Sequence, residues 1–136
     1  MPEAWIWFGW AQLHAGNPEA CIAASERAQR LSPQSSTATF AYDNLALAYW
    51  EAGRYEAGLE ASRRLVAAQP TYFTGYLYIA MNAVSLGHLE EARAAIAEGR
   101  RVQPDLSLEM IQRGFGVSRP EIDARRNAAL RQAGLE

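Results

Sequence analysis

The sequence predicts an all-α protein built from stacked pairs of antiparallel helices. The first observation is a sequence segment that occurs three times in similar form. The second is the constant position of one glycine and one proline within each copy. The glycines are Gly16, Gly53 and Gly87, and the prolines are Pro33, Pro70 and Pro104, so both markers advance by 37 and then by 34 residues. This spacing indicates a repeat architecture in which each unit buries its apolar face against the next one.

Each copy divides into two helical stretches joined at its glycine. The copies read "HAGNPEACIAASERAQRLSP", "EAGRYEAGLEASRRLVAAQP" and "SLGHLEEARAAIAEGRRVQP". Apolar residues recur at helical spacing on both sides of the glycine. The glycine ends the first helix because it adopts a left-handed conformation at little cost, and a proline, which lacks an N–H, closes the second. We therefore predict three helix-turn-helix repeats, at about 3–35, 38–71 and 72–105, within a first region 1–104.

These repeats resemble the tetratricopeptide repeat family, whose unit of 34 residues follows the pattern W-x₂-L-G-x₂-Y, A-x₃-F and P. The first helices match it at Trp5, Phe8 and Gly9, then at Tyr42, Leu45, Ala46 and Tyr49, and then at Tyr76, Ile79 and Ala80. The second helices place Cys21, Gly58 and Ala92 at the small position. Gln12 and Ala83 depart from the pattern, because they stand where the family has an aromatic residue. The resemblance covers residues 3 to 104 and implies an α-solenoid that binds protein partners.

The first step of the repeat is three residues longer than the second, and we assign the difference to residues 34–40. The segment reads as a longer loop in which Ser36 or Thr37 caps the following helix. A functional protrusion is the alternative.

Residues 105–136 predict two C-terminal capping helices. The first has Asp105 or Ser107 as its cap and Gly114 or Gly116 as its stop, and the second has Ser118 as its cap and Pro120 in its first turn. The last helix is amphipathic, with Ile122, Ala129 and Leu130 on its apolar side and Arg125, Arg126 and Arg131 on its polar side. A stack of hairpins needs such a terminal element with one apolar and one hydrated face.

The tail "RPEIDARRNAALRQAGLE" also resembles the ending of tetratricopeptide arrays that close bacterial multidomain regulators, notably class III adenylate cyclases. The resemblance implies that the chain is the C-terminal segment of a larger protein. The abrupt entry of "MPEAW" into a helical pattern agrees with this interpretation.

Composition narrows the classes of partner. The 136 residues are 49% hydrophobic and 21% charged, as expected for one globular unit, and the net charge of −2 comes from acids and bases spread along the chain. No basic block is present to attract nucleic acid. The single Cys21 favours a reducing, cytoplasmic setting. No apolar run approaches the roughly 18 residues needed to span a membrane.

No catalytic, metal or cofactor site assembles from the sequence. His14 and His88 fall in different repeats, Cys21 occupies a packing position, and no phosphate-binding loop or HExxH occurs. Glu90 and Glu91 begin a helix, where negative charge is favourable. We therefore expect a chain that is not an enzyme.

The family resemblance places the first helix of each repeat on the concave side. Projection of these helices predicts a peptide-binding groove lined by Trp7, Trp10, Asn44, Leu47, Trp50, Tyr78 and Met81. No basic residue stands beside Asn44, which disfavours a clamp for a terminal carboxylate. The hypothesis is a groove for an apolar or amphipathic segment, anchored by Trp10, Trp50 and Tyr78, with Asn44 bonding to the backbone of that segment.

A second interpretation starts from "AWIWFGW", a stretch without a polar side. Trp5 packs within its own hairpin, whereas Trp7 and Trp10 cover a preceding hairpin or the same surface of a second copy. On this interpretation the chain is a regulatory or oligomerisation segment of a larger signalling enzyme or transcriptional regulator and binds no separate peptide.

Overall fold

The computed structural model describes residues 2–33, 36–114 and 119–136, which form helices joined by turns. The helices are α1 (Pro2–His14), α2 (Pro18–Leu31), α3 (Ser36–Glu51), α4 (Tyr55–Ala68), α5 (Phe73–Ser85), α6 (Leu89–Val102), α7 (Leu108–Gly114) and α8 (Pro120–Gln132). The predicted all-α class is confirmed.

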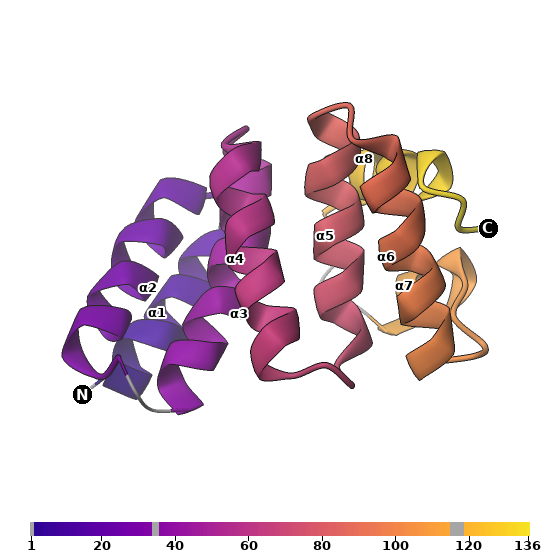
Figure 1. The fold of residues 1–136 in the computed structure, drawn as a ribbon. Coiled ribbons are helices and arrows are strands. Elements are labelled where there is room, and N and C mark those ends of the chain that lie inside the picture. Colours follow the sequence, from indigo (N-terminus) through magenta and orange to yellow (C-terminus); the bar gives the residue numbers. More distant parts are fainter. Residues whose placement is uncertain (1, 34–35, 115–118) are drawn as a thin grey trace.

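Three helix pairs stack side by side along the chain (Figure 1). The pairs are α1 with α2, α3 with α4, and α5 with α6. The first helices of the pairs also contact one another, α1 against α3 and α3 against α5, and so they form one continuous surface. We call this surface, which the family resemblance predicts to be concave, the inner surface. The arrangement is the predicted solenoid of helix-turn-helix units.

The three hairpin turns are built alike. Gly16, Gly53 and Gly87 have φ of +89°, +79° and +79°. In each turn the glycine N–H bonds to the carbonyl three residues back, at 3.0 to 3.1 Å, and the next N–H bonds to the carbonyl five residues back, at 2.8 Å. This pair of bonds is the Schellman motif, which needs a left-handed residue at the glycine position. The predicted glycine turns are confirmed.

The prolines mark the ends of the second helices. α2, α4 and α6 end two residues before Pro33, Pro70 and Pro104, respectively. The longer first step lies inside α3, and the predicted longer loop over 34–40 is wrong. α3 begins three residues after Pro33, just as α5 begins three residues after Pro70, but α3 has 16 residues and α5 has 13. Residues 36–40 are helical, and residues 34 and 35 lie outside the described part of the chain. Thr37 lies inside α3 and does not cap it; its hydroxyl donates to the Glu3 carboxylate at 3.4 Å.

Small residues let the helices approach closely. Cys21, Gly58 and Ala92 are all buried, as expected for the small position of each repeat. The side chain of Asn82 from α5 packs directly over Gly58, where any Cβ would overlap its amide. Asn82 donates from Nδ2 to the carbonyl of Tyr78 at 3.0 Å and to that of Ala46 at 3.4 Å. The amide therefore links α5 to α3 where the two helices approach each other.

The tail forms the two predicted helices. The hydroxyl of Ser107 accepts the backbone N–H of Met110 at 3.1 Å, so Ser107 is the cap of α7, which ends at Gly114. Gly116 and Ser118, the other sequence-based candidates for a stop and a cap, lie outside the described residues. α8 begins at Pro120 as expected.

The last helix stops in a fourth turn of the same design. Gly134 has φ of +100°, its N–H bonds to the Arg131 carbonyl at 3.0 Å, and the Leu135 N–H bonds to the Leu130 carbonyl at 2.9 Å. Leu130 and Leu135 are both fully buried. The "LRQAGL" part of the tail is therefore a Schellman stop with its usual apolar contact.

Candidate functional site

The inner surface is divided into two halves. One half is a cavity that α8 closes, lined on the repeat side by His14, Leu47, Trp50, Leu77, Tyr78 and Met81 and on the tail side by Arg119, Ile122, Asp123 and Arg126. The other half is a groove of about 430 Å³ lined by Glu3, Ile6, Trp7, Trp10, Ser36, Thr37, Phe40, Asp43 and Asn44. We call them the covered half and the open half. The seven residues of the predicted groove are thus shared between them.

In the covered half, α8 seals the aromatic surface of α3 and α5. α8 packs against α5 and lies behind it in Figure 1. Only 2% of Trp50, 6% of Tyr78 and 1% of Met81 remains exposed. The tail therefore covers the inner surface in addition to ending the stack, and it does so with Ile122 and with the charged side chains of Arg119, Asp123 and Arg126.

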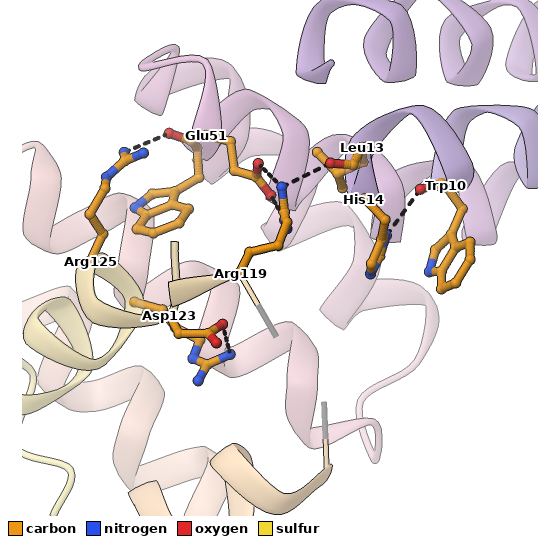
Figure 2. A network of polar contacts seen from close by, with 9 residues as sticks. Trp10, Leu13, His14, Glu51, Arg119, Asp123 and Arg125 are labelled. Atoms are coloured by element: carbon orange, nitrogen blue, oxygen red, sulfur yellow. Dashed lines mark hydrogen bonds and ion pairs between the residues drawn. The ribbon is translucent and has the colours of Figure 1, made fainter. Parts of the chain in front are cut away.

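Arg119 links the start of α8 to the C-terminal ends of α1 and α3. Its guanidinium makes a bidentate pair with Glu51, with Nη1 2.8 Å from Oε1 and Nη2 2.5 Å from Oε2. Nη1 also donates to the carbonyl of Leu13 at 2.8 Å (Figure 2). The Glu51 side chain is 3% exposed and that of Arg119 is 19% exposed, so water screens the pair weakly. Because Glu51 is a carboxylate at the negative end of α3, the arginine also offsets an unfavourable helix dipole.

Two more arginines of α8 contribute to the covered half. The Arg125 guanidinium carbon lies 4.4 Å from the centre of the Trp50 ring, a cation–π contact, and Nη2 donates to the Trp50 carbonyl at 3.4 Å. Arg126, assigned to the hydrated side of α8 from sequence, is instead buried, and its Nη1 lies 3.3 Å from Asp123. Burial lowers the pKa of Arg126, an effect that Asp123 opposes. The assignment was wrong because the rest of the protein covers more of the circumference of α8 than its apolar side, and Arg126 lies within the covered part.

A stacked ring pair marks the boundary between the halves. The rings of Trp10 and His14 lie 4.1 Å apart at 31°, and His14 Nδ1 is 3.0 Å from the Trp10 carbonyl. Figure 2 shows the two side chains next to each other, with Trp10 on the side of His14 that faces away from Arg119. Trp10 lines the open half and His14 lines the covered half. The two halves are therefore parts of one continuous surface.

The open half exposes large aromatic side chains. Trp7 is 69% exposed, Phe40 is 56% exposed and Trp10 is 44% exposed. Asn44, predicted to bond to a ligand backbone, donates from Nδ2 to the carbonyl of Ile6 at 3.1 Å. This hydrogen bond joins α3 to α1 and uses one of the two amide hydrogens of Asn44.

Asp43 is a half-buried carboxylate at the base of the open half. It accepts a hydrogen bond from the Tyr72 hydroxyl at 2.9 Å, and desolvation raises its pKa. Among the described residues, no arginine or histidine lies within ion-pair distance of it. Glu3 is the second charged residue of this groove, and the lining contains no basic side chain.

Three of the residues that shape this surface were not part of the predicted groove. Phe40 belongs to the segment treated as a longer loop, and no sequence signal distinguished its orientation. The pairing of Glu51 with Arg119 was not predicted, because 68 residues separate the two. The signal available was an amphipathic tail rich in arginine, in a chain whose second repeat carries the acidic residue Glu51 at the end of its inner helix.

The other sequence candidates occupy structural positions. His88 precedes α6, and Glu91 forms a bidentate pair with Arg63 on α4, whose Nε donates to Oε2 and whose Nη2 donates to Oε1. Cys21 is buried, which raises the pKa of its thiol to about 11 and keeps it protonated at neutral pH. Within the described ranges, no three His, Cys, Asp or Glu side chains are grouped as metal ligands. The helices described are also too short or too polar to cross a bilayer.

Comparison with known proteins gives the class to which this fold belongs. Residues 2–35 and 41–72 match the tetratricopeptide repeat model. TTC0263, a thermophilic tetratricopeptide repeat protein of Thermus thermophilus, is 26% identical with a TM-score of 0.71, over 98% of this chain and 73% of its own. MamA of MSR-1 is 16% identical with a TM-score of 0.69, over 98% and 79%. A putative protein-binding protein of Bacteroides ovatus ATCC 8483 is 13% identical with a TM-score of 0.51, over 98% and 81%.

No curated protein matches the chain at a significant level. The match shows tetratricopeptide repeats at residues 2–35 and 41–72, and the shared architecture supports a tetratricopeptide repeat protein. Proteins of this family are typically non-catalytic scaffolds that bind other proteins.

Proposed function

We propose that this chain is a non-catalytic interaction module whose inner surface binds an apolar or amphipathic peptide segment. The observation that carries the proposal is α8 itself, an amphipathic helix seated on the inner surface through Trp50, Tyr78 and Met81. The open half continues that surface with Trp7 and Trp10 exposed. The groove of the seven predicted residues thus holds an internal segment in one half and receives an external one in the other.

The open half has the composition of an interaction site. Tryptophan is enriched among the residues that dominate binding energy, because a rigid indole buries much apolar area at a small cost in conformational entropy. Trp7, Trp10 and Phe40 offer such area around Asn44, whose remaining amide hydrogen suits a peptide carbonyl. Clustered exposed aromatics of this kind mark a binding surface more often than a solvated one.

The test is titration of the chain with fluorescein-labelled amphipathic helical peptides, followed by anisotropy. Trp10→Ala should weaken the binding of a confirmed peptide by about tenfold or more. Phe8→Ala is the matched control, because Phe8 is 48% exposed on the same helix but does not line the groove. Equal affinities for the two variants would contradict the groove assignment.

We place the module in the cytoplasm, without nucleic acid, membrane or cofactor as a partner. The net charge of −2 and the acidic lining of the open half support the exclusion of nucleic acid. The buried, protonated thiol of Cys21 agrees with a reducing compartment.

The second candidate is a regulatory or oligomerisation segment of a larger signalling enzyme, such as an adenylate cyclase, or of a transcriptional regulator. Trp7 and Phe8 on α1 favour it, because they expose apolar surface that a preceding hairpin or a second copy would bury. Sedimentation velocity over a range of concentrations tests the self-associating form. A monomer at high concentration, with no shift for the double variant Trp7→Ala and Phe8→Ala, would count against it.

A further inference from the structure

We propose that the segment bound by the open half carries a cationic side chain, Arg or Lys, which pairs with Asp43 beside the Trp10 indole. This inference rests on the proposed function, since it names the chemistry of the ligand for the same groove. It commits to a basic amphipathic helix of a partner protein as the occupant.

The covered half shows how this surface recognises such a helix. There, the carboxylate of Glu51 holds Arg119, which directly precedes α8, in a bidentate pair, and the indole of Trp50 lies 4.4 Å from the guanidinium carbon of Arg125 on α8. The apolar Leu47, Leu77 and Met81 of the inner helices line the same cavity as Ile122 of α8. The elements of recognition are thus an inner carboxylate, an inner indole and an apolar floor.

The open half contains the same elements without a cation. Asp43 and Glu3 supply carboxylates, Trp7 and Trp10 supply indoles, and Ile6 is part of the floor. Among the described residues Asp43 has no basic partner, and no basic side chain lines the groove. Because the stacked rings of Trp10 and His14 join the halves, an incoming helix would lie on a surface continuous with the seat of α8.

Electrostatics favour a cation at Asp43 over any other group. The carboxylate is partly desolvated, and the hydrogen bonds that it accepts from the hydroxyls of Tyr72 and Tyr78 leave acceptor capacity on its two oxygens. A charge removed from water interacts strongly with an opposite charge, because the local dielectric constant is lower than that of the solvent. The two carboxylates of the groove would repel an acidic peptide or a phosphate backbone for the same reason.

The experiment compares three labelled peptides on the full chain. Each is an 18-residue model helix with leucine on one face; the other face carries arginine, glutamine or glutamate. We expect the arginine peptide to bind at least about tenfold more tightly than the glutamine peptide, the gain of one charge-assisted pair, and the glutamate peptide to bind most weakly.

Variants then assign the preference to one residue. Asp43→Asn keeps an acceptor for Tyr72 and should remove most of the difference between the arginine and glutamine peptides. Glu56→Gln is the matched control, because it removes the same charge from the exposed surface of α4, outside both halves. It should leave the difference unchanged.

The outcomes separate this inference from the proposed function. If the arginine and glutamine peptides bind equally well and Trp10→Ala weakens both, the groove binds amphipathic segments but the cationic preference is wrong. An equal loss for Asp43→Asn and Glu56→Gln would also overturn it, by showing non-specific attraction. If no peptide binds and the chain instead self-associates through Asp43, the occupant is a second copy and the partner assignment fails.

Discussion

The two halves of the inner surface are made from the same row of helices, yet they differ in what completes them. In the covered half the carboxylate of Glu51 has Arg119, and the Trp50 side chain is 2% exposed. In the open half the carboxylate of Asp43 has no basic partner among the described residues, and the Trp7 side chain is 69% exposed. The row of inner helices is thus covered by α8 in one half and exposes its aromatic side chains in the other.

The largest expected effect is a difference in stability between the alanine variants of Trp50 and Trp7. Trp50→Ala should lower the free energy of unfolding by about 3 to 5 kcal/mol, because it opens a cavity between the repeats and α8. Trp7→Ala should change it by about 0.5 kcal/mol or less, because most of the ring already faces water. Urea denaturation followed by circular dichroism measures both values. Similar losses for the two variants would mean that the halves do not differ in packing.

The next effect concerns the two bidentate ion pairs. Glu51→Gln should lower the free energy of unfolding by about 1.5 to 3 kcal/mol, since it removes a charge-assisted pair that is nearly buried. Glu91→Gln breaks the pair with Arg63, which is 50% exposed, and should cost about 1 kcal/mol or less. Hydrogen exchange provides a second measurement, with faster exchange of the α8 amides expected only for Glu51→Gln. Unchanged α8 protection would show that Arg119 does not fasten this helix.

The turns and helix ends follow from local sequence signals, whereas the seat of α8 does not. The glycine turns and the proline stops were predictable, because each depends on a property of a single residue. Glycine adopts the left-handed conformation at little cost, and proline lacks the N–H that would continue a helix. The amphipathic pattern of 120–132 was readable too, since it depends on residues three and four positions apart. The surface against which α8 packs could not be predicted, because an apolar stripe indicates that a helix is covered but not which surface covers it.

The site was predictable to a similar extent. The spacing of Trp10, Asn44 and Tyr78 placed them on one surface, where the structure has them. Their different exposures follow from α8, which reaches Tyr78 and Trp50 from a distant part of the chain. Arg126 was assigned to water for the same reason: its burial is set by α5 and Asp123 together and not by its position on the helix alone.

The smallest expected effect uses pH to sharpen the comparison of the two carboxylates. Burial raises the pKa of Asp43 above its ordinary value of 3.8, so the folded chain holds this proton more tightly than the unfolded chain. The associated stability is complete below about pH 3.8 and is lost as the pH rises through the folded pKa. Asp43→Asn removes that loss and should therefore be more stable than the parent at pH 7.

The measurement is the urea midpoint of parent and variant over a series of pH values. The two curves should converge as the pH falls toward 3.8, where both side chains are uncharged in the folded chain. A constant difference at every pH would show that the Asp43 carboxylate carries no desolvation penalty in the open half.

The most direct test of the central claim is a nuclear Overhauser experiment on the full chain, with Ile122 methyl-labelled and the aromatic rings assigned. The structure places Ile122 in one cavity with Trp50 and Tyr78, so cross-peaks from its methyl groups to these rings are expected, and none to Trp7. Absence of the Trp50 and Tyr78 cross-peaks in a folded sample would contradict the division of the inner surface into a covered and an open half.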